Sequence, residues 1–551
     1  MRFDLPDGEF VIPSGIVAST PDIIARIAEA ADGVGVITTK SIGRSERDGN
    51  REPIIAGIGG SLLNAVGLSN PGVAAFADEL NSLSVLSRVR KRGKVLMASI
   101  FGGSEGEFVE VASGLARYVD WIELNLSCPH AAGYGATIGT KPQLVESIVR
   151  AVREAVDLPI FAKIVPAIGL AGIVAKKAVG AGADGITAVN TVGPFEFLSP
   201  DGKPLLSNVL GSLSGQAIRE IAIRCVAEVR SEVNCPIIGM GGICSKGDVD
   251  AFRRAGANLF GVGTALLGMS TEEIVGFFKS IMAGQPAIKD PAICHRKWHV
   301  NDAWGSEKGR VLVMEESLSA LPGQFVHVWI PGIGEKPFSL ASDSPAVLLI
   351  KAVGPVSSAL CRLDEGSELL IRGPYGNGYR PSGMVSMVGG GTGVAPIHFA
   401  AKRFRGNVVD IFVGGKSSEE LPLLDELRRY AEVHVATEDG SLGRKCLVSG
   451  IMDMEGRGGI EFLNCGPEIM LTCVSEIEAR VTDPSKIFCI VERHSKCGVG
   501  ICGSCSIDGL RICVDGPVFR YSDLRGGRDF GRFKRSTSGK LVRIGHTNDG
   551  D

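Results

Sequence analysis

The sequence lacks the features that mark secreted, membrane and nucleic-acid-binding proteins. No apolar run approaches the roughly 18 residues that a membrane-spanning helix needs. The first nine residues, Met1–Glu9, are too charged for a signal peptide. The formal net charge is only -3, so no basic surface for nucleic acid is expected. We therefore expect a cytoplasmic protein that acts on a small molecule, without a membrane or nucleic-acid partner.

Chain length and cysteine content indicate the number of domains and the state of the thiols. A chain of 551 residues exceeds what one hydrophobic core normally organises, so two to four domains are expected. Of its 14 cysteines, four lie in one loop and ten are scattered, mostly in apolar segments. We expect those ten to be reduced and buried, with Cys128 as an exception.

The four clustered cysteines have the spacing C-x4-C-x2-C-x7-C, with glycines between the first three. Glycine lets such a loop turn three sulfurs inward while the fourth arrives from a neighbouring segment, which is typical of a plant-type [2Fe–2S] cluster. A structural zinc site and coincidental free thiols are the alternatives. The predicted ligands are Cys497, Cys502, Cys505 and Cys513; Cys489 lies nearby but outside the spacing. The chain is therefore expected to move single electrons.

The first 285 residues alternate short apolar runs with longer helical stretches. Eight such βα repeats are typical of a TIM barrel rather than a doubly wound sheet. The predicted strands are Val11–Val17, Gly33–Lys40, Val95–Ile100, Trp121–Cys128, Ile160–Val165, Gly185–Thr191, Pro236–Gly242 and Asn258–Leu266.

Polar residues and glycines stand at the ends of these predicted strands. In a TIM barrel all the carboxyl ends meet on one face, so a common site is expected there. The lysines could instead be solvated loop residues, and the glycines simple turns. The glycines, however, end strands seven and eight, where barrels commonly bind phosphate through backbone N–H groups. The strand-end residues are Lys40, Asn125, Cys128, Lys163, Asn190, Thr191, Gly241, Gly242, Gly263 and Thr264.

Cys128 is followed directly by Pro129, which breaks the strand. A cysteine here could be a small buried hydrophobe. A thiol in such a loop can also act as a base if its pKa is lowered.

Five motifs stand in order over nearly all of residues 10–270: Thr38–Ser41, Gly60–Gly72, Glu123–Pro129, Ala188–Thr191 and Leu213–Gly215. They resemble the motifs of class 1 dihydroorotate dehydrogenases. The resemblance implies FMN at the barrel mouth, with Lys40 and Lys163 near the isoalloxazine. It also implies that Gly215, Gly241, Gly242, Gly263 and Thr264 surround the ribityl phosphate.

The same resemblance implies the chemistry. Cys128 would remove the proton from C5 of dihydroorotate while a hydride leaves C6 for the flavin, with Lys40 as a second catalytic residue. The membrane-linked, quinone-using class carries serine where this chain has Cys128. Substrate contacts fall to Asn64, Asn125 and Asn190, since a carboxamide satisfies both donors and acceptors of a pyrimidine, and to Thr191. His130 departs from the family's further asparagine and is the last substrate candidate.

From about residue 294 the pattern changes to short alternating strands, predicted at Arg310–Glu315, Phe325–Ile330, Val347–Val353 and Glu368–Arg372. Such strands with Gly and Pro turns indicate a small antiparallel barrel, over residues 294–380. Residues 381–485 return to α/β sequence, where a glycine-rich turn joins a strand to a helix. Taken alone, that turn could be an ordinary tight connection.

Together these pieces resemble the ferredoxin–NADP reductase superfamily, and most closely the electron-transfer subunit of NAD-linked dihydroorotate dehydrogenase. The resemblance implies FAD at Lys336, Pro337, Phe338, Ser339, Gly373 and Gly376, and NAD at Gly390, Gly391, Thr392 and Gly393. Lys336 replaces the family's arginine, keeping the charge but losing the bidentate fork. Residues 486–522 would form the cluster module, and 523–551 a tail that is flexible or packs on another subunit.

The expected protein is thus multidomain: an α/β TIM barrel, an antiparallel β-barrel for FAD, an α/β nucleotide-binding domain and a small [2Fe–2S] module. We expect a fusion that oxidises dihydroorotate in pyrimidine biosynthesis and passes electrons from FMN through the cluster and FAD to NAD+. Its expected assembly is a homodimer or higher homo-oligomer. The alternatives are a dihydropyrimidine dehydrogenase-like enzyme for uracil or thymine, and an electron carrier with an inactive barrel. Lys416–Ser418 is a weak signal for NADP instead of NAD.

Overall fold

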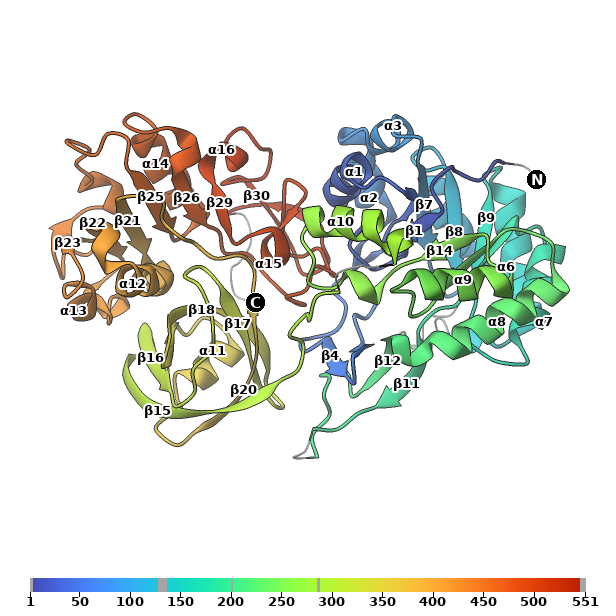
Figure 1. Cartoon of the computed structure of the whole chain (residues 1–551), viewed down its shortest axis with the longest axis horizontal. Coiled ribbons are helices and arrows are strands. Elements are labelled where there is room, and N and C mark those ends of the chain that lie inside the picture. The colour runs from blue at the N-terminus through green and yellow to red at the C-terminus, as the bar shows by residue number, and fades with distance from the viewer. Residues whose placement is uncertain (1–2, 127–135, 200–201, 285–287, 546–551) are drawn as a thin grey trace. The chain divides into compact units, whose positions relative to one another are not determined.

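The computed structural model describes residues 3–126, 136–199, 202–284 and 288–545. The chain divides into two compact units (Figure 1). The first comprises Met1–Pro291, Val499–Ser504 and Arg535–Lys540. The second comprises Ala292–Gly498, Cys505–Lys534 and Leu541–Asp551. The first unit is therefore discontinuous in sequence, unlike the single segment 1–285 that was predicted.

The core of the first unit is a closed barrel of eight parallel strands, which confirms the predicted TIM barrel. Their order is β1-β14-β13-β10-β9-β8-β7-β2. All eight predicted strands are present, although most are shorter than predicted; β1 already ends before Pro13, which has no N–H for a ladder. The strands are β1 (Phe10–Ile12), β2 (Val34–Thr38), β7 (Val95–Ile100), β8 (Trp121–Asn125), β9 (Ile160–Lys163), β10 (Gly185–Ala188), β13 (Ile237–Met240) and β14 (Leu259–Gly261).

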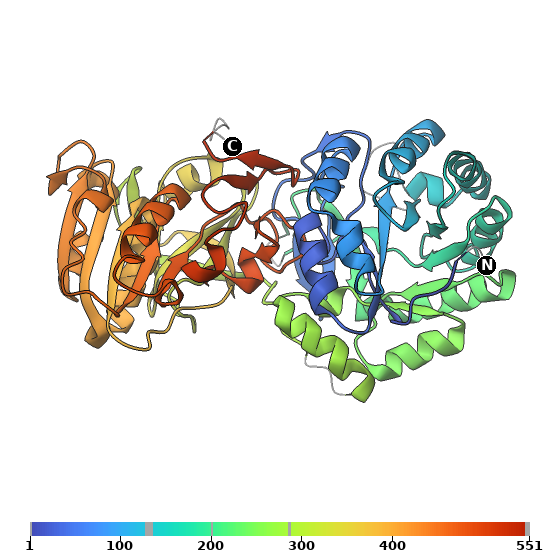
Figure 2. The ribbon, with the colours of Figure 1, turned by 90° about the horizontal axis from the view of Figure 1, so that it is seen from above.

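Helices surround these strands, as Figure 2 shows from above. In α6, for example, buried valines and an isoleucine at helical spacing form an apolar stripe. The helices are α1 (Pro21–Ala30), α2 (Val73–Ser82), α3 (Val85–Arg90), α4 (Glu105–Leu115), α5 (Ala136–Gly139), α6 (Pro142–Ala155), α7 (Ala171–Gly180), α8 (Arg219–Glu232), α9 (Lys246–Ala255) and α10 (Thr271–Ser280).

Aromatic residues fill the amino end of the barrel. Trp121 begins β8 and stacks on Phe161 of β9, with the ring centroids 4.9 Å apart. Phe3 packs edge-on against Trp121 at 4.8 Å. The packing closes this end, so a site has room at the opposite, carboxyl end of the strands.

Two small antiparallel sheets, which were not predicted, lie in the connections between barrel strands. One has the order β11-β12-β5-β4 and the other pairs β3 with β6. They place Asn64, the last residue of β5, directly opposite Ser212 of β12. The strands are β3 (Glu46–Arg47), β4 (Ile55–Ile58), β5 (Ser61–Asn64), β6 (Asn70–Pro71), β11 (Val192–Glu196) and β12 (Leu210–Gly215).

The second unit begins with a closed antiparallel barrel of six strands in the order β15-β16-β19-β18-β17-β20, which confirms the predicted small barrel. The sequence did not predict β15 or β18, because long stretches of both are polar and half-exposed. The strands are β15 (Arg296–Ser306), β16 (Gly309–Met314), β17 (Phe325–Ile330), β18 (Gly334–Asp343), β19 (Ala346–Ile350) and β20 (Glu368–Tyr375), with α11 (Pro355–Leu360) between β19 and β20.

A seven-stranded sheet follows, in the order β24-β23-β22-β21-β25-β26-β29. It extends past the predicted boundary at residue 485, because β26 and β29 complete its edge by antiparallel pairing. The strands are β21 (Val385–Gly390), β22 (Val408–Gly415), β23 (Glu432–Thr437), β24 (Arg444–Lys445), β25 (Glu461–Cys465), β26 (Ile487–Ile490) and β29 (Val518–Arg520). The helices that follow strands of this sheet are α12 (Val394–Arg403), α13 (Leu424–Leu427), α14 (Glu468–Glu478) and α16 (Tyr521–Leu524).

The segment predicted to be a flexible tail is folded as far as residue 545, so that prediction is wrong for the described residues. It contains a two-stranded sheet of β30 (Phe533–Arg535) and β31 (Leu541–Arg543). Arg535 and Ser538 are buried. The physical reason is that its basic and hydroxyl side chains pair with carboxylates of the first unit.

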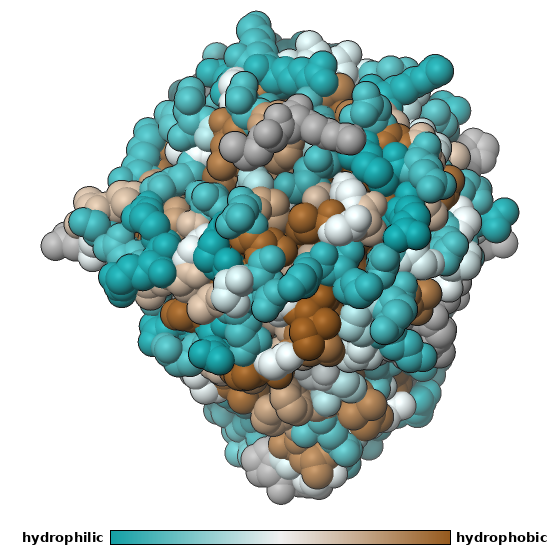
Figure 3. All heavy atoms as spheres, turned by 90° about the vertical axis from the view of Figure 1, so that its right-hand side faces the viewer, coloured by the Kyte–Doolittle hydropathy of each residue, from teal (hydrophilic) through white to brown (hydrophobic). Residues whose placement is uncertain are grey.

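Hydrophilic residues predominate on the face shown in Figure 3, where hydrophobic residues form small separate groups. Among the described helices, none combines the length and apolar character that crossing a membrane requires.

Candidate active site

A pocket opens at the carboxyl ends of the barrel strands in the first unit. It gathers eleven of the residues predicted from the sequence. They are Lys40, Asn64, Asn125, Lys163, Asn190, Thr191, Gly215, Gly241, Gly242, Gly263 and Thr264. Cys128 and His130 lie outside the described residues. The residues meet because parallel strands end at one edge; Asn125 of β8, for example, stands opposite Lys163 of β9.

A chain of hydrogen bonds orders the carboxamides on one wall of this pocket. Asn190 donates from Nδ2 to Asn125 Oδ1 at 3.1 Å, and Asn125 donates from Nδ2 to Ser41 Oγ at 2.9 Å. Asn64 donates to the Ser212 carbonyl oxygen at 3.1 Å. Ser41, which was not predicted, thus orients Asn125; its place directly after Lys40 was the available signal. The three carboxamides are preorganised to bind a flat polar ligand.

A buried carboxylate lies behind Lys163. The Lys163 Nζ is 3.6 Å from Oε1 of Glu123, and the Glu123 side chain is fully buried. Neither oxygen of Glu123 has a hydrogen-bond partner among the described atoms. Because the ionic attraction is the principal compensation for burying this group, Glu123 restrains the ammonium of Lys163 at the pocket floor.

Glycines form a cradle on the opposite wall. Gly215 and Gly242 have φ values of +95° and +83°, which favour glycine. A Cβ on Gly242 would lie 2.8 Å from the Gly215 carbonyl oxygen, and a Cβ on Gly215 would lie 3.1 Å from Thr264 Cγ2. Any side chain would therefore fill the cradle. These glycines line the pocket at the end of β12 and just after β13, and a wall without side chains fits the phosphate of a nucleotide cofactor such as FMN.

The cysteine loop contributes to the same pocket, which the sequence did not predict. Ile501 and Cys502 line it beside the barrel residues. Ser19 donates a hydrogen bond to the Ile501 carbonyl oxygen, and Gly268 N–H donates to the Val499 carbonyl oxygen at 3.1 Å. A Cβ on Gly503 would lie 2.7 Å from Ser19 Cβ, so the loop's glycine permits this close packing. One predicted cluster ligand therefore lies at the wall of the predicted flavin site.

The other three predicted ligands belong to the second unit and are also buried. The sulfurs of Cys505 and Cys513 are 3.5 Å apart. Hydrogen bonds with Cys497 and Cys505 hold the pKa of the Cys513 thiol well above its ordinary value. Thiols this close share protons that a metal would displace on binding, so the loop fits an iron–sulfur cluster.

A fully buried charged network holds the start of this loop. Arg372 of β20 donates two hydrogen bonds to Glu335 of β18, at 2.7 and 2.6 Å. It also donates to the Tyr375 hydroxyl at 2.9 Å and to the Cys497 carbonyl oxygen at 2.8 Å. Its Nη2 lies 3.2 Å from Nδ1 of His327. An arginine inside the apolar run of β20 was the sequence signal for this network.

The network has a defined charge state. Burial opposes ionisation of Glu335, but the Arg372 guanidinium holds the pKa of this carboxyl well below its ordinary value. Burial and the same guanidinium lower the pKa of His327. The Glu335 carboxylate and the Arg372 guanidinium therefore form the ion pair, and His327 is neutral beside them.

The residues predicted to bind FAD lie on adjacent strands of the six-stranded barrel. Ser339 of β18 and Tyr375 of β20 both stand opposite Phe325 of β17. Lys336, Pro337, Phe338 and Ser339 are half-exposed, whereas residues on either side of this run are buried. Gly373 lies within β20 and Gly376 directly follows it. The run thus presents a polar strand surface that an extended cofactor could cover.

The residues predicted to bind NAD lie at a reversal in the strand order of the seven-stranded sheet. β21 has β22 as its neighbour on one side and β25 on the other. The chain therefore adds β22 and β23 on one side of β21 and then crosses to add β25 and β26 on the other side. Gly390 ends β21, and Gly391, Thr392 and Gly393 precede α12. A Cβ on Gly393 would lie 2.4 Å from the Cys465 carbonyl oxygen at the end of β25. Nucleotides bind at such switch points in α/β sheets.

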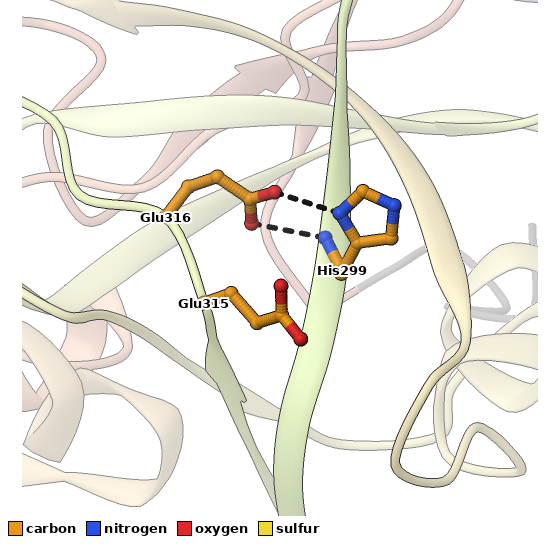
Figure 4. A group of neighbouring side chains, drawn as sticks. All are labelled: His299, Glu315 and Glu316. Atoms are coloured by element: carbon orange, nitrogen blue, oxygen red, sulfur yellow. Dashed lines mark hydrogen bonds and ion pairs between the residues drawn. The ribbon is translucent and has the colours of Figure 1, made fainter.

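Among the described residues, one further group has the composition of a metal site. His299 of β15 lies beside Glu315 and Glu316, as Figure 4 shows. Glu316 accepts hydrogen bonds from the His299 backbone N–H and ring Nδ1, both at 2.9 Å. The Glu316 hydrogen bond raises the pKa of His299. This pairing accounts for the group as a surface ion pair.

Comparisons with known proteins match both halves of the chain. A family model described as "Dihydroorotate dehydrogenase" matches residues 7–280. Another, described as "Iron-sulfur cluster binding domain of dihydroorotate dehydrogenase B", matches residues 492–525. The chain is 41% identical over 276 residues to the "Dihydroorotate dehydrogenase B (NAD(+)), catalytic subunit" of Methanocaldococcus jannaschii, covering 89% of that protein and 49% of this chain. It is 40% identical over 253 residues to the "Probable dihydroorotate dehydrogenase B (NAD(+)), electron transfer subunit" of Pyrococcus abyssi, covering 98% of that protein and 45% of this chain.

Proposed function

The chain belongs to the dihydroorotate dehydrogenase B (NAD(+)) family, and we propose how its residues divide the work of that activity. The enzyme oxidises dihydroorotate to orotate in pyrimidine biosynthesis, with NAD+ as the electron acceptor. Matches to both a catalytic and an electron-transfer subunit cover one polypeptide. The two functions are therefore fused in this chain.

One observation carries the proposed electron route. Cys502, a predicted cluster ligand, lines the same pocket as the eleven predicted flavin and substrate residues. Electrons leaving a flavin in that pocket would need to cross only the wall formed by Ile501 and Cys502. FMN, when bound, would accept the hydride that leaves the substrate; a [2Fe–2S] cluster would pass the electrons one at a time to FAD, which would collect two of them and reduce NAD+ by hydride transfer.

The substrate end is assigned to the carboxamide wall. Asn64, Asn125 and Asn190 would hold the planar ring through paired donors and acceptors. Thr191 and His130 complete the proposed substrate contacts. Cys128 would take the proton from C5 as the hydride leaves C6, so that the C5–C6 double bond of orotate forms. Lys40 would place its ammonium beside the ring and the flavin.

The flavin end is assigned to the glycine cradle and Lys163. Backbone N–H groups around Gly215, Gly242 and Gly263 would bind the phosphate, with Gly241 and Thr264 shaping the turn. Lys163, restrained by Glu123, would set a positive charge beside the isoalloxazine. A charge there stabilises the anionic reduced form of a bound flavin.

We assign the remaining cofactors to the second half of the chain. FAD would lie along Lys336–Ser339, Gly373 and Gly376, and NAD over Gly390, Gly391, Thr392 and Gly393. Cys497, Cys502, Cys505 and Cys513 would be the cluster ligands. The functional regions proposed are the barrel (1–285), the FAD barrel (294–380), the nucleotide sheet (from 381) and the cluster loop. The sheet topology extends the nucleotide region to β29.

A steady-state assay tests this function. Full-length protein, purified without oxygen, is assayed with dihydroorotate or dihydrouracil as substrate and with NAD+ or NADP+ as acceptor, and reduction of the nucleotide is measured. We expect turnover with dihydroorotate and NAD+ only. Turnover with dihydrouracil but not dihydroorotate would overturn the substrate assignment and favour a dihydropyrimidine dehydrogenase. Turnover with NADP+ but not with NAD+ would overturn the assignment of NAD+ as the electron acceptor.

A further inference from the structure

The short segment Arg535–Lys540 is part of the first unit, although it stands near the end of the chain. Neither matched family model extends over it. The segment is a tight turn in which Gly539, with a φ value of +89°, donates its N–H to the Ser536 carbonyl oxygen at 3.0 Å. We refer to residues 535–540 as the clamp.

Arg535 anchors the clamp between two helices of the barrel. Its guanidinium donates two hydrogen bonds to Glu79 of α2, at 2.7 and 2.6 Å, and lies 3.1 Å from Asp22 of α1. The arginine side chain is fully buried. It also donates to the Gly539 carbonyl oxygen at 3.3 Å, which fixes the turn on its own anchor. A bidentate pair of this kind defines both position and orientation.

The other side of the clamp holds the strand pair β3–β6. Ser538 donates to Oε1 of Glu46 at 2.7 Å, and Lys540 Nζ lies 3.0 Å from Oε2 of the same carboxylate. Thr537 donates a hydrogen bond to Asp48. These carboxylates belong to β3 and the residue beyond it, so the clamp spans from the helices to this small sheet.

The clamp also reaches the pocket itself. Ser69 lines the pocket, and its Oγ donates to the Thr537 carbonyl oxygen at 3.1 Å. A Cβ placed on Gly539 would lie 3.7 Å from the Lys40 Nζ. The pocket wall Val66–Ser69, which continues from Asn64, is therefore fixed from outside by the backbone of the clamp.

We propose that the clamp positions the substrate wall of the pocket, with Arg535 as a positioning residue for dihydroorotate binding. This inference rests on the proposed function of the pocket. The clamp accepts a hydrogen bond from Ser69 and approaches Lys40, two residues that line the pocket. Because the hydrogen bond that ties it to the pocket is made by Ser69 of the substrate wall, loosening the clamp should weaken substrate binding more than it slows hydride transfer to the flavin.

The test compares full-length Arg535→Ala and Arg535→Lys with the parent protein. We expect Arg535→Ala to raise the KM for dihydroorotate about 10- to 100-fold with less than a threefold change in kcat, and to weaken orotate binding, read from the flavin spectrum, by a similar factor. Arg535→Lys keeps the positive charge but cannot make the bidentate hydrogen bonds of a guanidinium. It should therefore raise KM and weaken orotate binding less than Arg535→Ala does. FMN content should stay unchanged.

Arg153→Ala is the matched control. Arg153 pairs with Asp184 at 3.0 Å, and both side chains are 12% exposed, close to the 11% of Glu79, but the pair lies at the amino end of β10. It should lower the melting temperature without changing KM. The double variant Ser538→Ala/Lys540→Ala removes both clamp contacts of Glu46, a carboxylate that is 41% exposed, so it leaves no deeply buried charge. This variant replaces Arg535→Ala in the same assays if Arg535→Ala does not fold.

Three outcomes are distinguishable. Raised KM and weaker orotate binding in the clamp variants, with Arg153→Ala unchanged, support the proposal. Clamp variants that match the parent in KM and orotate affinity overturn it, as does an equal rise in Arg153→Ala. A parent protein whose flavin is not reduced by dihydroorotate overturns the proposed function instead.

Discussion

Replacing Arg372 with methionine tests whether the buried network supports the second unit and its cysteine loop. The arginine and Glu335 are both fully buried. Arg372→Met removes the guanidinium, so the Glu335 carboxylate loses its principal counter-charge. The Cys497 carbonyl oxygen and the Tyr375 hydroxyl lose the hydrogen bonds that they accepted from the guanidinium. Breaking a buried ion pair in this way costs about 3–5 kcal/mol. For a unit of this size that corresponds to a fall of roughly 6–20 °C in its melting temperature.

Scanning calorimetry of the holoprotein measures the fall, and a second variant identifies its cause. Arg372→Met/Glu335→Leu leaves neither charge buried, so it should be more stable than Arg372→Met alone. The pH dependence has a defined sign. The depressed pKa of Glu335 contributes stability above its unfolded pKa of about 4.3, and this contribution is lost as the pH falls through the folded value. The difference between the parent and Arg372→Met should therefore shrink below about pH 4.

The same variant should alter the cluster. Arg372 is a buried positive charge bonded to the backbone of a proposed ligand, and reduction of the cluster adds a negative charge. Removing the arginine should therefore make the midpoint potential of the paramagnetic signal more negative. A melting temperature within 2 °C of the parent, additive effects in the double variant and an unchanged potential would together refute the reasoning; the 2 °C limit is about the effect of a single kcal/mol.

Three further predictions concern the cofactors and the base. Cys128→Ala should retain FMN and bind orotate but lose about 10²–10⁴-fold in flavin reduction by dihydroorotate, measured by stopped flow; near-normal reduction would exclude the thiol as base. Cys502→Ser should abolish the [2Fe–2S] signal and NAD+ reduction while dihydroorotate still reduces the flavin, whereas Cys489→Ser should leave the signal intact; zinc without iron in the parent would contradict the cluster. Gly242→Ala should lower FMN content because its Cβ enters the cradle, while Gly169→Ala, at a similar φ of +82° with open space around it, should not; equal flavin loss in both would contradict the cradle.

Local sequence patterns were sufficient to predict the barrels and most of the pocket. All eight barrel strands were identified, because buried strands need apolar β-branched runs that are visible in sequence. Residues such as Lys40, Asn125 and Lys163 could be assigned to one site because the carboxyl ends of parallel strands meet at one edge. The ends of the strands were predicted less well, and the polar strands β15 and β18 were not predicted.

Contacts between distant segments could not be predicted in this way. The cysteine spacing by itself determined a cluster loop, since ligand geometry requires it. Only the tertiary structure decided that Cys502 reaches the flavin pocket, that Arg372 bonds the backbone at Cys497, and that Arg535 lies between Asp22 and Glu79. The local sequence around an isolated arginine or serine in a polar segment does not predict which residue it will pair with. The conformation of Arg535, for example, is set by a carboxylate 456 residues away, and that pairing exists only once the chain has folded.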